Sequence, residues 1–379
     1  MRRLLPLSLL LAAALVPAGA HAAVRKGPAG LAFYKPPAHL PGGTHGRLIW
    51  ARRTSARSWL VLYRSVGLNG KVDAVSGVVS VPKGRAPKGG WPVISYAHGT
   101  TGIADGCAPS RAPSTAAYVK PLLDRWLKAG YAVATTDYDG LGTPGIHPYL
   151  IGAPEGHDVL DIVRAARGLG VSVGPRVILS GHSQGGQAAL YAAALASKWT
   201  PELTIRGTVA FAPVTHLAAQ LPLTRSITTP SGITGLAAMI IRGIGLGDPS
   251  LHVESLLTPQ AAALFPQVDT RCLDDLDKPD SFGGMAPSQL LRSDADLNPL
   301  ATALHRLEDA ETLTIKTPLR IEQGSADTTV FPAFTDQTVQ EYSKRGTPLV
   351  YKKYDGVTHG GIVVAAAGDA TSWIRQRLK

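Results

Sequence analysis

One serine of the chain lies between two glycines, in the run Gly181-His182-Ser183-Gln184-Gly185. Glycines two residues before and two residues after a serine are typical of a tight turn between a strand and a helix, where larger side chains would clash. Residues 176–180 predict the strand, and a helical pattern begins at Gly186. We therefore predict that Ser183 lies at the tip of this turn and acts as a nucleophile.

A serine hydroxyl needs a general base to take its proton, and a carboxylate to orient that base. His359 stands in a glycine-rich turn after the predicted strand 349–354, and Asp327 follows the predicted strand 319–323. In enzymes whose nucleophile lies in such a turn between a strand and a helix, the catalytic residues follow one another along the chain in the order serine, aspartate, histidine, as they do here. We predict His359 as the base and Asp327 as its partner. The rival carboxylate, Asp355, precedes the histidine by only four residues.

The other histidines that could act as the base do not follow a predicted strand in this way. His182 belongs to the serine turn itself and cannot turn back onto its neighbour. The remaining candidates precede the serine or fall in the long segment behind it: His147, His157, His216, His252 and His305.

The negatively charged intermediate of acyl transfer needs two N–H donors. One is the backbone N–H of Gln184, the residue after the nucleophile, and the other comes from the loop after an earlier strand. That loop is His98-Gly99-Thr100-Thr101-Gly102, in which we predict Thr100, with Thr101 as the alternative. Loss of one such donor typically costs about 3 kcal/mol of transition-state stabilisation.

Strand and helix patterns alternate along most of the chain. Short β-branched runs with little alternation predict a mostly parallel sheet, buried on both faces by helices, and so an α/β fold. The predicted strands are 59–66, 72–81, 91–97, 131–136, 176–180, 206–211, 319–323 and 349–354, with a turn at 68–70. The predicted helices are 115–128, 155–167, 186–198, 333–344 and 361–378.

The alternation lapses over residues 214–313. An interruption of this length is too long for a structureless loop in a compact domain, so it predicts an inserted, mainly helical cap or lid. The catalytic domain then comprises residues 23–213 and 314–379.

The first 22 residues predict a signal peptide rather than part of the fold. Arg2 and Arg3 precede an apolar stretch, residues 4–16, and Ala20-His21-Ala22 offers a small-x-small cleavage site. The alternative is an anchor that stays attached. Cleavage near Ala22 would place the mature protein outside the cytoplasm, in the extracellular space or the periplasm.

Composition excludes several classes of function. Hydrophobic residues make up 45% and charged residues 17%, as in a globular protein, and the formal net charge is +11. The positive residues are scattered without a long basic run, so we expect a solvated surface and no nucleic-acid partner.

The two cysteines, Cys107 and Cys272, predict a disulfide in an oxidising compartment. Neither stands near another cysteine or histidine, so we expect no metal site and no cofactor.

These motifs resemble those of the secretory lipase family, the lipase A type of α/β-hydrolase. The likeness rests on residues 98–102 and 181–186, on Asp137-Tyr138-Asp139-Gly140-Leu141-Gly142-Thr143-Pro144-Gly145 and on Gly324-Ser325-Ala326-Asp327. The resemblance implies an α/β-hydrolase fold with a cap between strands six and seven, and lipase or esterase activity on acyl esters. The substrate would be a lipid or an ester bound to a polymer.

The cap contains an apolar stretch, residues 231–248, interrupted by glycines and Arg242. We predict that Leu236, Ile240 and Ile244 line an acyl-binding site, either in a mobile lid that contacts a lipid interface transiently or in a fixed cap. The alternative is a buried helix packed on the catalytic domain. We expect a monomer.

Two other classes of function remain open. A serine peptidase of the aminopeptidase type, or an acyltransferase, uses the same three residues. A peptidase would recognise the amine of its substrate with acidic cap residues, for which Glu254 and the pair Asp274-Asp275 are weak candidates. A binding protein on an inactive hydrolase fold would usually lack one of the three residues, and here all three are present.

Overall fold

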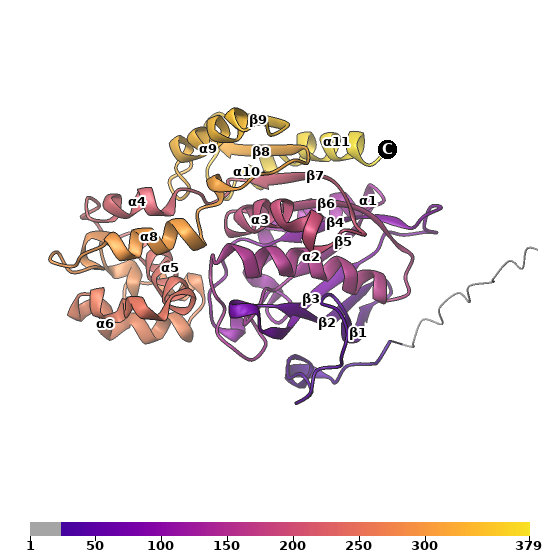
Figure 1. Ribbon diagram of the computed structural model, residues 1–379, viewed down its shortest axis with the longest axis horizontal. Coiled ribbons are helices and arrows are strands. Elements are labelled where there is room, and N and C mark those ends of the chain that lie inside the picture. Colours follow the sequence, from indigo (N-terminus) through magenta and orange to yellow (C-terminus); the bar gives the residue numbers. More distant parts are fainter. Residues whose placement is uncertain (1–23) are drawn as a thin grey trace, which may run out of the picture.

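The computed structural model describes residues 24–379, so the predicted signal peptide lies outside the described residues. A nine-stranded sheet with helices on both faces forms one part of the molecule, and a group of helices lies beyond one end of the strands (Figure 1). The α/β-hydrolase fold expected from the sequence is confirmed.

The strands follow the spatial order β1-β2-β3-β5-β4-β6-β7-β8-β9. The first three are antiparallel, as is the β3–β5 pair, and all later pairs are parallel. Their bounds are β1 Leu48–Ser55, β2 Ser58–Val66, β3 Val72–Ser80, β4 Trp91–Ala97, β5 Ala132–Thr136, β6 Val173–His182, β7 Thr204–Phe211, β8 Leu319–Gly324 and β9 Leu349–Tyr354.

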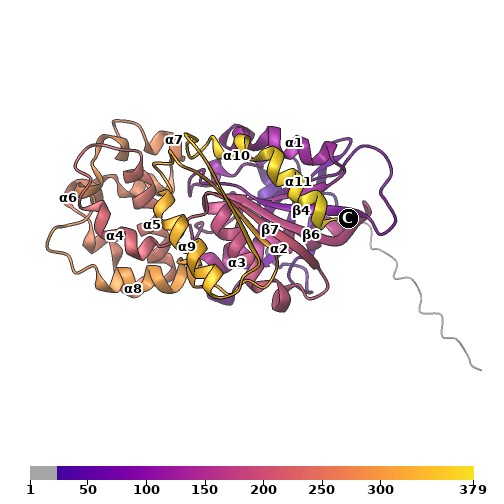
Figure 2. The same ribbon diagram turned by 90° about the horizontal axis from the view of Figure 1, so that it is seen from above.

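The central strands are apolar because both of their faces are covered. On β4, Val93 and Ala97 pack into one hydrophobic core, while Ile94 and Tyr96 pack into another on the opposite face. Helices α2 (Gly152–Gly168) and α3 (Gln184–Trp199) contribute to the first core, and α1, α10 and α11 to the second (Figure 2). The remaining bounds are α1 Lys120–Lys128, α9 Pro332–Lys344, α10 Ile362–Ala365 and α11 Ala367–Arg377.

Four local features differ from the sequence expectation. Strand β1 was not predicted, since its second half is polar and exposed at the edge of the sheet. The expected turn at 68–70 is a short 3₁₀ helix, Leu68–Gly70. The helix expected over 115–128 begins as a 3₁₀ helix, Pro113–Val119, before α1. The closing helix is divided into α10 and α11 at Ala366.

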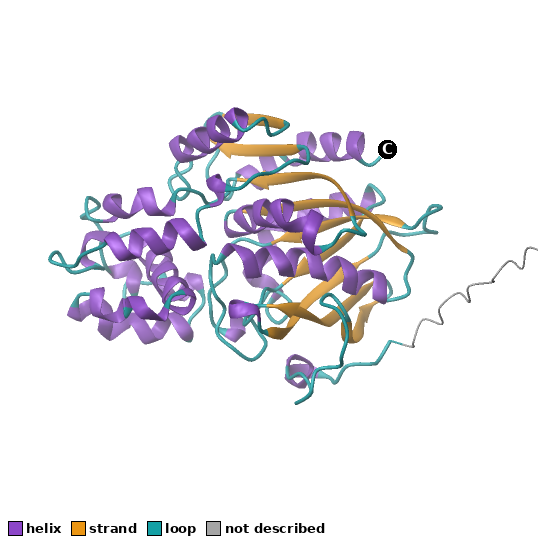
Figure 3. Ribbon diagram, viewed as in Figure 1, coloured by secondary structure: helices purple, strands orange, loops and turns teal. Residues whose placement is uncertain are grey.

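Between β7 and β8 lies an insertion that is built of helices and loops (Figure 3). Its α-helices are α4 Leu217–Thr224, α5 Ile233–Gly247, α6 Pro259–Leu264, α7 Leu273–Leu276 and α8 Asn298–Leu307. Their buried side chains form a hydrophobic core of their own, which Ile103 and the segment 149–151 join from the sheet side. The insertion therefore lies over the carboxyl ends of the parallel strands, where the predicted functional residues stand (Figure 1).

Among the helices of residues 24–379, none has both the length and the apolar character that crossing a membrane requires.

Candidate functional site

Ser183 lies in a strained turn between β6 and α3. Its backbone has φ 58° and ψ −120°, and its N–H donates to the carbonyl of Phe211 at 2.9 Å. A Cβ atom on Gly181 would lie 2.0 Å from the carbonyl oxygen of Gly185, and one on Gly185 would lie 2.0 Å from that of Ala97. The two glycines are thus required by the close approach of three backbone segments, which hold the serine at the tip.

Asp327 and His359 form a hydrogen-bonded pair at the ends of β8 and β9. His359 Nδ1 lies 2.8 Å from Asp327 Oδ2, and the other carboxylate oxygen accepts the N–H groups of Thr329 and Val330 at 2.9 and 2.8 Å. Burial alone would raise the pKa of Asp327, but the hydrogen bond and charge of His359, together with the two N–H groups, lower it below its ordinary value. The carboxylate therefore stays ionised and can accept a hydrogen bond from the His359 ring.

An open hollow brings the predicted residues together. Ser183, His359 and Thr100 all line it, as do Asp274 and Asp277 of the insertion. Burial, reinforced by Asp274, raises the pKa of Asp277 to about 6. Glu254 is exposed on another part of the insertion, away from this hollow.

His182 has a positioning role that the sequence did not reveal. Its Nε2 lies 3.1 Å from the carbonyl oxygen of His359, and its Nδ1 lies 2.8 Å from the hydroxyl of Tyr118. Because a carbonyl can only accept, Nε2 carries the proton and Nδ1 accepts from the tyrosine. Burial and the nearby His359 lower the pKa of His182 to about 3, so the ring stays neutral. It packs against the ring of His359 at a centroid distance of 4.6 Å and thereby supports it.

The loop after β4 places its two threonines differently. Thr100 lines both the open hollow and an adjoining apolar pocket, each together with Ser183. Its hydroxyl lies 2.6 Å from that of Tyr149. Thr101 is buried, lines neither cavity, and accepts the N–H of Leu273 on its carbonyl at 3.0 Å.

Gln184, the first residue of α3, is held by a buried polar group behind the serine. Its amide nitrogen lies 2.7 Å from Glu155 Oε1 and 2.9 Å from His147 Nε2. The same glutamate oxygen accepts the N–H of Leu150 at 2.8 Å. Burial raises the pKa of Glu155 to about 8 and lowers that of His147 to about 3, so both groups are neutral near pH 7. The sequence contains no local pattern that pairs these residues.

The apolar pocket lies between Ser183 and the insertion. Its wall is formed mainly by aliphatic side chains of α4, α5 and α8, including Leu217, Leu236, Ile240 and Leu300. The described residues that line it include no charged side chain.

Two of the three predicted binding residues thus lie at the pocket wall, and Ile244 does not. Ile244 is fully buried in the core of the insertion, one helical turn beyond Ile240. At this point α5 packs closely on the segment below it, since a Cβ on Gly243 would lie 2.2 Å from the carbonyl oxygen of Tyr149. The pocket therefore ends before Ile244, and the prediction for this residue is corrected.

A disulfide joins Cys107, behind the loop after β4, to Cys272, which precedes α7. Their Cα atoms lie 5.4 Å apart. Next to the bridge, Gly102 pairs with Cys272 in an antiparallel β-bridge. The insertion is therefore fastened, covalently and by backbone hydrogen bonds, to the loop that carries Thr100.

Comparison with known proteins gives a consistent picture. Lipase A of Moesziomyces aphidis is 26% identical over 262 residues, 63% of this chain and 54% of its own length, so the chain spans about half of that relative. The structure of Candida antarctica lipase A in its closed state superposes with a TM-score of 0.75 at 22% identity, covering 91% of this chain and 84% of that one. A rice cell wall degrading esterase, LipA of Xanthomonas oryzae, gives 0.73 at 19% identity, covering 89% and 99%.

These two structures share the fold. The family model described as "Secretory lipase" matches residues 114–379, which is more than half of the chain. The chain belongs to the secretory lipase family.

Proposed function

We propose that this protein is a secreted serine carboxylic-ester hydrolase, a lipase or esterase, that forms an acyl-enzyme intermediate on Ser183. The observation that carries the proposal is the position of Ser183, which lines both the open hollow shared with His359 and the apolar pocket under α5. A nucleophile at this junction has a base on one side and space for an aliphatic acyl chain on the other.

In the first half of the reaction, His359 acts as general base. Its Nδ1–H donates to Asp327, which leaves Nε2 as the free acceptor. As Ser183 Oγ attacks the ester carbonyl carbon, its proton passes to Nε2. The N–H groups of Gln184 and Thr100 stabilise the oxyanion, and the position of Thr100 beside Ser183 in both cavities supports it over Thr101.

Collapse of the tetrahedral intermediate breaks the bond to the alcohol oxygen, and the imidazolium of His359 gives its proton to that oxygen. The acyl group stays on Ser183. Water then attacks the acyl-enzyme while His359 takes its proton, and the second collapse returns this proton to Oγ and releases the acid.

The character of the two cavities favours an acyl chain as the bound group. Burial of each CH₂ in an apolar pocket contributes about 0.8 kcal/mol, and the pocket wall offers no charge that a chain would have to desolvate. The alcohol part then faces the open hollow. The size of the alcohol part is less restricted there. The alcohol can therefore belong to a lipid, presented during a transient contact with a lipid interface, or to a polymer.

The acidic wall of the open hollow favours a second candidate, a serine peptidase of the aminopeptidase type. Asp274 and Asp277 line the same cavity as Ser183 and His359, as expected for a site that binds a substrate amine. Hydrolysis of an aminoacyl p-nitroanilide, lost in Asp277→Asn, would favour this function. We expect no such hydrolysis, because the apolar pocket fits the acyl chain of an ester.

The proposal also includes the organisation of the chain. We infer that residues 1–22 are removed as a signal peptide, that residues 23–213 and 314–379 form the catalytic domain, and that residues 214–313 form its cap. The mature protein acts outside the cytoplasm as a monomer.

Ser183→Ala tests the central step. The variant should fold normally and lose all but a trace of its turnover on p-nitrophenyl esters, by roughly 10⁴-fold or more, because the remaining residues cannot replace the nucleophile. Ser250→Ala, an exposed serine of the insertion, is the matched control and should retain full turnover.

A serine-directed organophosphonate gives an independent readout. It should add once to the wild type and not to Ser183→Ala, with the adduct on the peptide that contains Ser183. Turnover of Ser183→Ala comparable to that of the control would remove this residue from the mechanism.

A further inference from the structure

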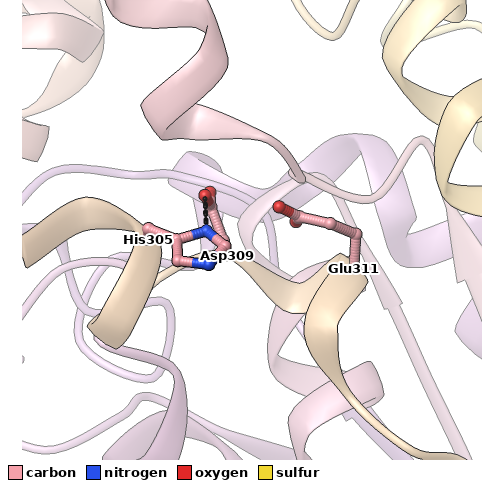
Figure 4. A group of neighbouring side chains, drawn as sticks. All are labelled: His305, Asp309 and Glu311. Carbon is pink, nitrogen blue, oxygen red and sulfur yellow. Dashed lines mark hydrogen bonds and ion pairs between the residues drawn. The ribbon is translucent and has the colours of Figure 1, made fainter. Parts of the chain in front are cut away.

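A group of metal-ligating side chains lies where the insertion rejoins the sheet, away from Ser183. His305 comes from the last turn of α8, and Asp309 and Glu311 follow it on the way to β8. Their ligand atoms all lie within 4.8 Å of one another, and His305 Nδ1 is 3.2 Å from Asp309 Oδ2. Figure 4 shows the three side chains directed toward one another.

These side chains line a hollow that is separate from the one at Ser183, and a second histidine, from the other end of the insertion, lines it too. His216, just before α4, is only 4% exposed, and its Nδ1 lies 3.4 Å from Glu311 Oε1. On the far side of the ring, its buried Nε2 has no hydrogen-bond partner among residues 24–379 and faces Glu341 Oε2 at 3.6 Å. With Nε2 directed toward Glu341, Nδ1 is the nitrogen of His216 that is turned toward Glu311.

Both carboxylates are held so that one oxygen of each stays available. Asp309 Oδ1 accepts the N–H of Leu217 at 2.6 Å, and Glu311 Oε2 accepts the N–H of His216 at 3.0 Å. The other oxygens, Asp309 Oδ2 and Glu311 Oε1, are the ones that lie close to the two imidazoles. Ligating carboxylates in metal sites are oriented by hydrogen bonds of this kind.

We propose that His305, Asp309 and Glu311 bind one divalent cation of the zinc class, and that His216, whose Nδ1 lies 3.4 Å from Glu311 Oε1, joins them as the fourth ligand when the cation binds. In a tetrahedral zinc site with bonds of about 2.0 Å, neighbouring ligand atoms lie about 3.3 Å apart, close to the two imidazole–carboxylate distances here. Glu341 completes the arrangement, because a metal-binding histidine commonly gives its outer N–H to a carboxylate.

The charge and type of the ligands select the metal. Asp309, Glu311 and Glu341 bring three carboxylates to the hollow, against the single guanidinium of Arg345. Two imidazole nitrogens with two carboxylate oxygens suit zinc, whereas calcium and magnesium prefer oxygen ligands alone. The bound cation would join the first residues of the insertion to its last, and so would stabilise the base of the insertion without taking part in the reaction at Ser183.

The test uses the secreted chain without an affinity tag, stripped of metal by a chelator and titrated with zinc chloride. We expect one zinc ion per chain by calorimetry and a higher Tm, reversed by the chelator. Calcium chloride is expected to leave Tm unchanged. Failure to bind zinc, or an equal rise of Tm with calcium, would overturn the assignment.

Two variants locate the site. The side chain of His305 is 63% exposed, so His305→Ala removes a ligand with little effect on packing and should weaken zinc binding at least 10-fold. Glu311→Gln should have a similar effect on zinc binding. His39→Ala, an exposed histidine far along the chain, is the control and should bind zinc as the wild type does. Unchanged affinity in His305→Ala would show that zinc binds elsewhere, such as at His359, and would refute the proposal.

Discussion

Glu155 is a buried carboxyl group that holds the amide of Gln184 and the N–H of Leu150. Burial raises its pKa from 4.5 to about 8, so between these values the folded chain keeps a proton that the unfolded chain has released. Stability is therefore lost as the pH rises through this window, by up to ~1.4 kcal/mol per pH unit.

Glu155→Gln keeps the accepting oxygen and cannot ionise, so the free energy of unfolding of this variant should fall less between pH 5 and 8. Urea unfolding at several pH values measures this, with the exposed Glu254→Gln expected to match the wild type; equal slopes in all three proteins would contradict the assignment.

Helix α5 presents two isoleucines one turn apart with different surroundings, Ile240 at the pocket wall and Ile244 in the core. Ile240→Asp should reduce kcat/KM for long-chain esters at least 10-fold more than for acetate, because only a long chain reaches the altered wall. Ile244→Asp places a charge in the core, so it should lower Tm and reduce activity on both esters alike. Rates on both substrates and the Tm of each variant separate the two effects. If Ile240→Asp behaves like Ile244→Asp, the helix is structural and the acyl pocket is wrong.

The elements that the sequence predicted well are those whose patterns are local. The serine turn follows from its glycines and from the apolar, buried end of strand β6. The strands before Asp327 and His359 were predicted as well, although only β8 is buried throughout, and β9 is partly exposed at the edge of the sheet. Strand β1 escaped prediction because its exposed half carries Arg52 and Arg53, which tolerate an edge position. The contact of Glu155 with Gln184, and that of His216 with Glu311, join residues far apart in the chain, and no spacing rule reports such pairs.

For the molecule as a whole, the bridge between Cys107 and Cys272 closes a loop over a sequence separation of 165 residues. A loop of this length restricts the unfolded chain enough to contribute roughly 5 kcal/mol in the chain-entropy model. The native protein should show no free thiol, and reduction should lower its Tm by several degrees. In the double variant Cys107→Ala/Cys272→Ala, the Tm should already be low, and reductant should change it no further. Two titratable thiols in the unreduced native protein would rule out the bridge.

The insertion is attached to the sheet at two places, through its chain ends beside α4 and α8 and through Cys272, which precedes α7; α7 and α8 lie on opposite sides of it (Figure 2). A rigid body fixed at two separate points keeps one rotational degree of freedom, about the line that joins them. Because Thr101 and Gly102 are bonded to Leu273 and Cys272, the neighbouring Thr100 lies beside one end of this axis, where a rotation displaces atoms least. A rotation that widens the apolar pocket would therefore leave the N–H of Thr100 nearly in place, so a long bound chain could open the pocket without changing the geometry at the carbonyl that Ser183 attacks.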